Sequence, residues 1–432
     1  MDNTSASSSA HHPEGEHIMA STVCLTGTLD TKGEEYAYVK EQIEATGTSV
    51  LTVDCGVLGD PTFTPDITAE EVAAKAGVNL SEWRDSSEDA GGRVSANQAM
   101  SKGLTGVLTD LVAEGKIQAV LALGGTGGTD LASAAYRELP LGFPKLIVST
   151  MASNNTRPYV GHSDMYMANA VTDIAGLNSV SRVVLANAAH AIAGMADHYE
   201  KTKELAAASE PLIGISMFGV TTPGVMRMRE QLEADGFQVA TFHAVGEGAG
   251  MEALVDEGMI DGLIDFTLPE ILNRWNDGIF DPGIDRLKAM TRNDIPVVVV
   301  PGAAECFNFG AVETIPEQYN TPERKVHIHN PNITSLHATE DELAKLGGYI
   351  ADHVNQAMGP KAMALPLGGL DNYFAEGSCW HGSDVTALHN AIRENLDDGI
   401  EIIEMDNNIN DEAFADAVYG LFKERWAQAQ AN

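Results

Sequence analysis

Short apolar runs alternate along the chain with longer stretches in which apolar side chains recur at helical spacing. The first run is Val23-Cys24-Leu25, and a polar loop separates it from a predicted helix with Tyr36, Val39 and Ile43 on one face. The strands predicted after it are 50–53, 119–123, 146–149, 212–218, 237–242, 262–266, 297–300 and 400–403. Strands that are apolar throughout are typical of parallel sheets buried on both faces. The pattern therefore predicts an α/β protein.

The helices predicted between and after these strands divide the chain into two similar series. They cover 69–76, 95–114, 131–138, 180–208, 251–257, 283–290, 385–395 and 411–427. We expect two doubly wound, Rossmann-like domains, 21–205 and 206–432, with mainly parallel sheets that face each other across a cleft. Residues 1–20 are rich in Ser, His and Glu, so they are expected to form a disordered tail.

Charge narrows the choice of partner. The 432 residues include 62 Asp and Glu against 26 Lys and Arg, which gives a formal net charge of −36. A protein that binds a phosphate backbone needs clustered cations. Nucleic acid is therefore not an expected partner. The excess of acidic residues is interpreted as a property of a soluble protein surface.

Neither a membrane segment nor a cysteine-based site is expected. No apolar stretch approaches the roughly 20 residues that span a bilayer, and the first residues lack the features of a signal peptide. The four cysteines, Cys24, Cys55, Cys306 and Cys379, lie far apart and form no CxxC pair. The sequence predicts a soluble, cytoplasmic protein with reduced thiols.

A glycine-rich loop follows the apolar run 119–123 and precedes a predicted helix. It consists of Gly124, Gly125, Thr126, Gly127, Gly128 and Thr129. Glycines let backbone N–H groups approach an anion, and a helix N-terminus adds partial positive charge, so the loop is a candidate phosphate site. It matches neither GxxxxGK[ST] nor a complete GxGxxG, and a tight strand-to-helix turn is the alternative.

The loop after the first strand carries a second group of candidates. Thr31 and Glu34 have the spacing of a capping box, which is a sufficient structural explanation for both. Asp30 and Lys32 are not needed for such a cap. Asp30 is a candidate ligand for a ribose hydroxyl or a magnesium ion, and Lys32 for a phosphate.

A third loop, after the run 146–149, is rich in hydroxyl groups. Its candidate ligand-binding residues are Ser149, Thr150 and Ser153, and Asp164 a little further on is a candidate metal ligand. Open α/β sheets bind ligands beyond the carboxyl ends of their strands. The three loops are therefore expected to converge on one site.

The second domain offers weaker candidates. His243 and Glu247 follow a predicted strand and lie among glycines, so they are candidates for acid–base catalysis, although a histidine in a turn more often caps it. His327 and His329 share one face of a predicted strand, 325–329. With His337 they are candidates for a metal site, with histidines free of metal as the favoured alternative.

Taken together, the loops resemble a known family. The motifs that carry the resemblance are GTLDTKGEE at 27–35, LALGGTGGTDLASAA at 121–135, PKLIVSTMAS at 144–153, GHSDMYM with VTDIAGLN at 161–178, and FGVTTPG with FHAVGEGAGME at 218–252. The family is the uncharacterised protein family related to the N-terminal ATP-binding domain of the tomato mosaic virus resistance protein. The similarity extends from about Thr22 to the C-terminus.

The resemblance implies a two-domain α/β protein that binds ATP with magnesium and commonly forms a dimer. It places the nucleotide at the Asp30-Thr31-Lys32 loop, at Gly124 to Thr129, and at Ser149, Thr150 and Ser153. The plant relative carries an appended second half that is missing here, and its interaction with a viral replication protein is not carried over.

Three functions remain open at this stage. The first is an ATP·Mg²⁺-dependent enzyme of small-molecule metabolism, with its substrate in the cleft between the domains. The second is a non-catalytic, ATP-sensing module that binds a protein partner. The third is a sugar-nucleotide epimerase or transferase, which rests on fold alone.

Overall fold

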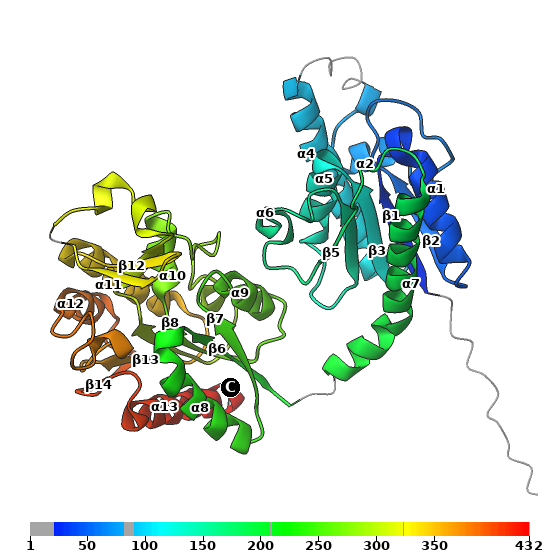
Figure 1. Ribbon diagram of the computed structural model, residues 1–432. Helices are drawn as coiled ribbons and strands as arrows, with labels where there is room; N and C mark the ends of the chain where they lie inside the picture. The colour runs from blue at the N-terminus through cyan, green and yellow to red at the C-terminus, as the bar shows by residue number, and fades with distance from the viewer. Residues whose placement is uncertain (1–20, 82–89, 208–209, 323, 432) are drawn as a thin grey trace, which may run out of the picture. The chain divides into compact units, whose positions relative to one another are not determined.

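The computed structural model describes residues 21–81, 90–207, 210–322 and 324–431. The expected disordered tail, 1–20, lies outside these residues. The chain divides at residue 207 into two compact units, and each is described by itself below (Figure 1). In the described part of the chain, no helix is long and apolar enough to cross a membrane.

The first unit is built on a parallel sheet. Its strands are β1 (Thr22–Gly27), β2 (Ser49–Asp54), β3 (Ala119–Gly124), β4 (Lys145–Ser149) and β5 (Tyr166–Asn169). They lie side by side in the order β2-β1-β3-β4-β5, and every neighbouring pair is parallel. The chain moves to one side after β1 and to the other from β3 on. The strand order therefore reverses between β1 and β3.

Helices cover both faces of this sheet. They are α1 (Leu29–Glu44), α2 (Ala69–Lys75), α4 (Ala90–Ala113), α5 (Thr126–Tyr136), α6 (Arg157–Val160) and α7 (Ser179–Ala207). Successive strand residues point to opposite faces, so Val23 and Leu25 pack with α1 and α7 whereas Cys24 packs with α2, α4 and α5. This alternation of wholly apolar strand residues confirms the predicted α/β class.

The second unit contains a larger parallel sheet. Its strands are β6 (Leu212–Met217), β7 (Gln238–His243), β8 (Gly262–Thr267), β9 (Val297–Gly302), β13 (Lys361–Pro366) and β14 (Glu401–Met405), in the order β14-β13-β9-β8-β6-β7. A small antiparallel sheet in the order β10-β12-β11 consists of β10 (Cys306–Phe309), β11 (Val326–Asn330) and β12 (Ile333–His337). Only β11 of this small sheet corresponds to a predicted strand.

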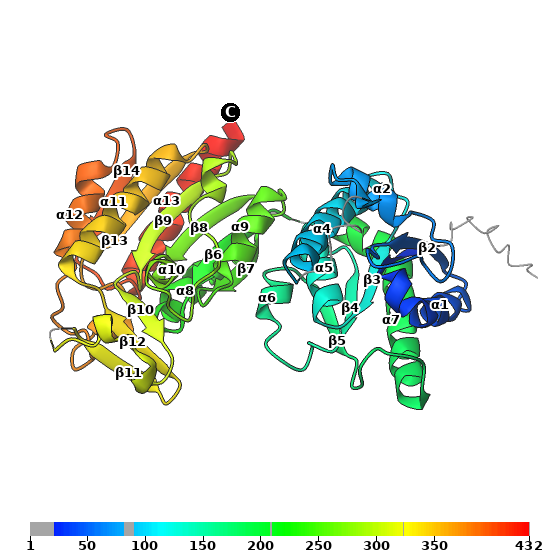
Figure 2. The ribbon, with the colours of Figure 1, turned by 90° about the horizontal axis from the view of Figure 1, so that it is seen from above.

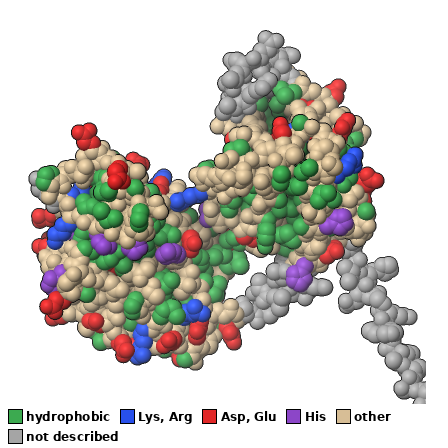
Figure 3. All heavy atoms as spheres, viewed as in Figure 1, with side chains coloured by type: hydrophobic (Ala, Val, Ile, Leu, Met, Phe, Trp, Pro, Cys, Tyr) green, Lys and Arg blue, Asp and Glu red, His purple; other side chains and the backbone are tan. Residues whose placement is uncertain are grey.

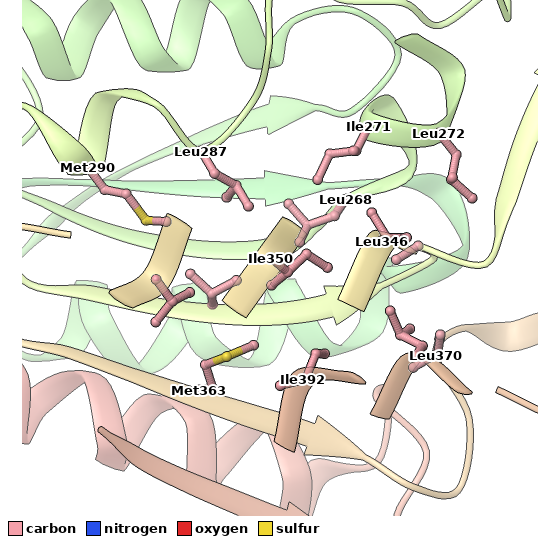
Figure 4. Close-up of a cluster of buried hydrophobic side chains, with 14 of the residues drawn as sticks. Leu268, Ile271, Leu272, Leu287, Met290, Leu346, Ile350, Met363, Leu370 and Ile392 are labelled. Atoms are coloured by element: carbon pink, nitrogen blue, oxygen red, sulfur yellow. The ribbon is translucent and has the colours of Figure 1, made fainter. Parts of the chain in front are cut away.

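The helices of the second unit also form two layers. They are α8 (Thr222–Ala234), α9 (Gly248–Asp256), α10 (Pro269–Trp275), α11 (Glu340–Gln356), α12 (Thr386–Asn395) and α13 (Glu412–Ala431), with 3₁₀ turns η1 (Gly219–Thr221), η2 (Ala289–Thr291), η3 (Val312–Thr314), η4 (Glu317–Tyr319) and η5 (Asn372–Phe374). The helices α11 and α12 run side by side (Figure 2). Leu346 and Ile350 of α11 meet Ile392 of α12 and Met363 of β13 in the core drawn in Figure 4.

The prediction of a helix over residues 283–290 is wrong. Only the 3₁₀ turn η2 touches this segment, which is otherwise irregular. Gly283 and Leu287 both have positive φ values, 79° and 71°, and a helix requires negative ones. The segment instead carries Arg286 into the interior, where it is 1% exposed.

The surface agrees with the charge count. On the face shown in Figure 3, acidic side chains are scattered over both units rather than gathered in one patch. Such a distribution is that of a solvated surface, and it does not mark a binding face by itself.

Candidate functional site

A hollow of about 400 Å³ lies where the strand order of the first sheet reverses, at the carboxyl ends of β1 and β3. We call it the switch-point pocket. Its lining residues are Thr28, Asp30, Thr31, Val57, Leu58, Asn97, Gln98, Gly127, Gly128 and Asp130. Doubly wound proteins bind their ligands at this position of the sheet, so the topology and the cavity indicate the same place.

The glycine-rich loop forms one wall of this pocket. Gly124 ends β3, and α5 begins at Thr126 with Gly125 as its N-cap. A Cβ atom at Gly124 would lie 2.9 Å from the backbone of Gly128, so this position accepts only glycine. At Gly127, by contrast, an added Cβ would meet no atom within 4 Å. The first turn of α5 is therefore open toward the pocket, with backbone N–H groups that lack intrahelical partners.

Asp30 is held in the opposite wall by backbone groups of the loop after β2. Its Oδ2 accepts hydrogen bonds from the N–H groups of Leu58 at 2.8 Å and Gly59 at 3.1 Å. Its Oδ1 is buried and has no hydrogen-bond partner in the described part of the chain. Asp30 thus has a fixed orientation and one free acceptor oxygen.

The predicted capping box of Thr31 and Glu34 is not formed. The helix α1 begins earlier, at Leu29, and no side chain caps it at Thr28. The N–H of Leu29 donates instead to Oδ1 of Asp54 at 3.0 Å, on the neighbouring strand β2. Burial raises the pKa of Asp54, although hydrogen bonds from Gly56 and Leu29 oppose the shift.

Several predicted ligand-binding residues lie beside the pocket rather than in its lining. The ammonium group of Lys32 donates to the carbonyl of Ile174, in the loop after β5. The buried hydroxyls of Thr129 and Ser149 bond each other at 2.6 Å, which ties the glycine-rich loop to the end of β4. Thr126 lies at the start of α5, where its hydroxyl contacts the sulfur of Met151 at 3.4 Å.

Thr150 and Ser153 line a neighbouring hollow of about 420 Å³. Its other lining residues come from the end of β5 and the loop that follows it: Asn169, Val171, Thr172 and Asp173. The hydroxyl oxygen of Thr150 would lie 3.8 Å from a Cβ atom placed on Gly125. The structure therefore brings the three predicted loops to one edge of the sheet but divides their residues between two hollows.

Asp164 lies elsewhere. Its carboxylate pairs with Lys145, the first residue of β4, and accepts the N–H of Gly142 at 2.7 Å. The amino end of β4 is opposite to the edge that carries the pocket. Asp164 thus neutralises a lysine that is itself 1% exposed.

Six lining residues of the pocket were not among the predicted site residues: Thr28, Val57, Leu58, Asn97, Gln98 and Asp130. Val57 and Leu58 supply an apolar wall, and the Leu58 side chain is 55% exposed. Asn97 reaches from α4 to the carbonyl of Gly127 at 3.0 Å, and Asp130 lies one turn into α5. Thr28 and Asp130 lie within the GTLDT and GGTGGTD motifs, so the sequence contained a signal for them. The other four depend on how α4 and the loop after β2 pack.

In the second unit, His243 ends β7, and Glu247 lies in the turn that follows it. The contact between them runs through the backbone: Oε2 of Glu247 accepts the N–H of His243 at 3.0 Å. The imidazole of His243 is exposed and lies 5.9 Å from the ring of Phe218. Glu247 therefore closes the turn before α9, and its catalytic role stays a prediction.

A buried ion cluster in this unit was also missed. Arg286 binds Glu270 at 2.9 Å, Asp265 at 3.1 Å and Glu252 at 3.4 Å. Burial opposes the charge of Arg286, but the three carboxylates hold its pKa above the ordinary value, and burial raises the pKa of each carboxylate. A Cβ atom at Gly248 would lie 2.0 Å from Arg286 and Glu270. The cluster thus fixes the start of α9.

Two further carboxyl groups, Glu305 and Asp371, are fully buried in the loops after β9 and β13. Both oxygens of Glu305 and Oδ2 of Asp371 lack a donor among the described residues. One proton held between the two groups provides a hydrogen bond from one carboxyl group to the other. Burial and the neighbouring Asp371 raise the pKa of Glu305 well above its ordinary value, and burial raises the pKa of Asp371 to about 7.

Fold and site together define a doubly wound α/β protein of two units, with a glycine-lined pocket at the switch point of the first sheet. The chain belongs to the uncharacterised protein family UPF0261. The model of the family's N-terminal domain matches residues 21–201, and that of its C-terminal domain matches residues 210–426. This confirms the family predicted from the loop motifs.

Relatives come from bacteria and from a plant. A UPF0261 protein of Clostridium tetani is 40% identical over 403 residues, which are 93% of this chain and 98% of the relative. The ToMV resistance protein Tm-1(GCR237) of Solanum lycopersicum is 33% identical over 419 residues, which are 93% of this chain but 55% of the tomato protein. Among solved structures, Phytolacca americana UGT2 aligns over 96% of this chain and 95% of its own, at 9% identity and a TM-score of 0.22.

Proposed function

We propose that this protein binds ATP together with Mg²⁺ in the switch-point pocket, as an ATP-dependent enzyme of small-molecule metabolism. The observation that carries the proposal is the open first turn of α5 at the reversal of strand order, beside a hollow of about 400 Å³. Backbone N–H groups and the helix dipole favour a phosphate there. The family resemblance of the loop motifs supports the choice of ATP.

The lining of the pocket suits the parts of a nucleotide. Leu58 and Val57 offer an apolar surface for a base, and Asn97 and Gln98 offer amide groups for its polar edge. A ribose would find the hydroxyl of Thr31. The phosphates would lie at Gly127 and Gly128, where no side chain occupies the space.

Two carboxylates in the lining fit a magnesium ion. Asp30 has a buried oxygen without a partner, and Asp130 lines the same pocket. The described residues contain no group of three or more His, Cys, Asp or Glu side chains placed to hold a metal. Mg²⁺ commonly takes one or two carboxylates and completes its shell with water and substrate phosphates. The bound ion would neutralise charge on the phosphates.

A non-catalytic, ATP-sensing role is the second candidate. Neither Lys nor Arg is among the residues that line the switch-point pocket, and phosphoryl transfer is usually supported by a cation beside the transferred group. The two candidates differ in turnover. Turnover of ATP is measured in the presence of a panel of small carboxylic acids and sugars. Hydrolysis of ATP or transfer of its phosphoryl group supports the enzyme, whereas tight binding of ATP without turnover supports the sensor.

Titration calorimetry with ATP and Mg²⁺ tests the proposal, with Gly127→Asp as the variant. Gly127 lies in the first turn of α5 and has open space around it, so an aspartate there fits sterically and even favours the helix N-terminus. Its charge next to a phosphate would cost up to about 4 kcal/mol at close range. We expect affinity to fall at least 100-fold, with Gly127→Ala as the matched uncharged control.

A further inference from the structure

A third hollow, of about 250 Å³, lies in the second unit beside the small antiparallel sheet. Its lining residues are Thr321, Arg324, Lys325, His337, Ala338, Thr339, Ser383 and Asp384. They come from the segment before β11, from the end of β12 and the residues after it, and from the residues before α12 (Figure 2). We call it the β12 pocket. Its size suits a small molecule, because pockets for larger ligands begin at about 300 Å³.

Two cationic side chains, Arg324 and Lys325, line the β12 pocket. The side chain of Arg324 is 8% exposed and is held by Glu342 at 3.0 Å and by the rings of Phe307 and Tyr319. Its Nε–H has no partner in the described part of the chain. Lys325 is positioned by the hydroxyl of Ser383 at 2.7 Å.

The same hollow contains an acceptor without a partner. Nδ1 of His337 lies 2.7 Å from the carbonyl oxygen of Ala338. Because a carbonyl only accepts, Nδ1 carries the proton, and Nε2 of the neutral ring keeps its lone pair. Nε2 is buried without a partner among the described residues, in a side chain that is 8% exposed. Burial, together with the charges of Lys325 and Arg324, lowers the pKa of His337, which keeps the ring neutral.

The two carboxylates near the pocket already have partners. Glu342 holds Arg324 and closes the capping box of α11 with Thr339. Asp384 accepts the N–H of Thr386 at 2.8 Å at the start of α12. Among Arg324, Lys325 and His337, the open positions are Nε–H of Arg324, the remaining ammonium hydrogens of Lys325 and Nε2 of His337.

We propose that the β12 pocket binds a small hydroxycarboxylate. Its carboxylate is held by Lys325 and by Nε–H of Arg324, and its hydroxyl donates to Nε2 of His337. A ligand with both groups satisfies the donors and the acceptor together, which a simple carboxylate does not. This site goes beyond the proposed nucleotide function and does not depend on it.

Titration of the full chain with D-glycerate, followed by calorimetry and ligand-observed NMR, tests the assignment. Lys325→Met removes the exposed cation, and His337→Asn keeps an N–H for Ala338 while it removes the Nε2 acceptor. The matched control is Lys423→Met. Lys423 lies on α13 and pairs with Asp235 at the end of α8. Thermal melting checks that each variant is folded.

We expect Lys325→Met to weaken glycerate binding at least tenfold and Lys423→Met to leave it unchanged. His337→Asn should abolish the preference for glycerate over acetate, and Gly127→Asp should leave glycerate binding intact. Absence of glycerate binding to the folded wild type would overturn the proposal. The proposal would also be overturned if Lys325→Met bound glycerate as tightly as the wild type does. The same holds if the wild type bound acetate or inorganic phosphate as tightly as glycerate.

Discussion

The buried carboxyl pair Glu305 and Asp371 makes the stability of the second unit depend on pH. Both pKa values are raised in the folded state, that of Asp371 to about 7. A carboxyl group with a raised pKa stabilises the fold when it is protonated, and this contribution is lost as pH rises toward the folded-state value. The free energy of unfolding should therefore fall between pH 5 and pH 7.

The variant Glu305→Gln isolates this effect. Glutamine is neutral at every pH and can donate to Asp371, so the extra proton of the folded state is no longer needed. One proton difference changes the unfolding free energy by about 1.4 kcal/mol per pH unit. Over the two units from pH 5 to pH 7, the variant should gain roughly 2 to 3 kcal/mol relative to wild type.

Urea unfolding at pH 5, 6 and 7, followed by tryptophan fluorescence, measures this gain. Trp275, Trp380 and Trp426 all belong to the second unit, so the signal reports mainly on it. Glu313→Gln, at an exposed carboxylate of the same unit, is the control and should parallel wild type. Parallel pH curves for Glu305→Gln and wild type would refute the shared proton.

Three further predictions concern other charged groups. Arg286→Met leaves three buried carboxylates without their cation, so it should cost about 3–5 kcal/mol in urea unfolding or prevent folding; a loss below 1 kcal/mol would contradict the role of the cluster. Asp164→Ala should lower the unfolding free energy of the first unit by about 1–3 kcal/mol, because it removes the carboxylate that neutralises buried Lys145, while calorimetry shows unchanged ATP affinity. Asp30→Asn should weaken ATP binding in the presence of Mg²⁺ more than in its absence, and an equal effect in both would argue against a metal ligand.

The sheets were predictable because their strands are apolar on both faces. Val297 to Val300, for example, can only lie inside a layered α/β structure. In the small antiparallel sheet only β11 was predicted. The strands β10 and β12 are four and five residues long, too short for their apolar pattern to stand out from a loop. The false helix 283–290 arose because local apolar spacing does not show that three distant carboxylates bind Arg286.

The lining of the switch-point pocket includes residues of the predicted loops, but also neighbours that were not predicted. The glycine-rich loop and Asp30 follow strands directly, and the ends of parallel strands meet at one edge. Leu58 and Asn97 reach the pocket only because β2 lies next to β1 and α4 packs on α5. Lys32 has a charge that suits a phosphate, but its ammonium group donates to the carbonyl of Ile174. The backbone of α1 is also non-helical at this residue, with a φ of −132°.

Calorimetric titration with ATP and Mg²⁺, run in parallel on wild type, Gly127→Ala and Gly127→Asp, tests the central claim most directly. The account predicts micromolar binding by wild type, nearly equal binding by Gly127→Ala, and at least a 100-fold loss in Gly127→Asp, with all three proteins folded. Wild-type protein that is folded and does not bind ATP would contradict it, as would equal affinity in Gly127→Asp.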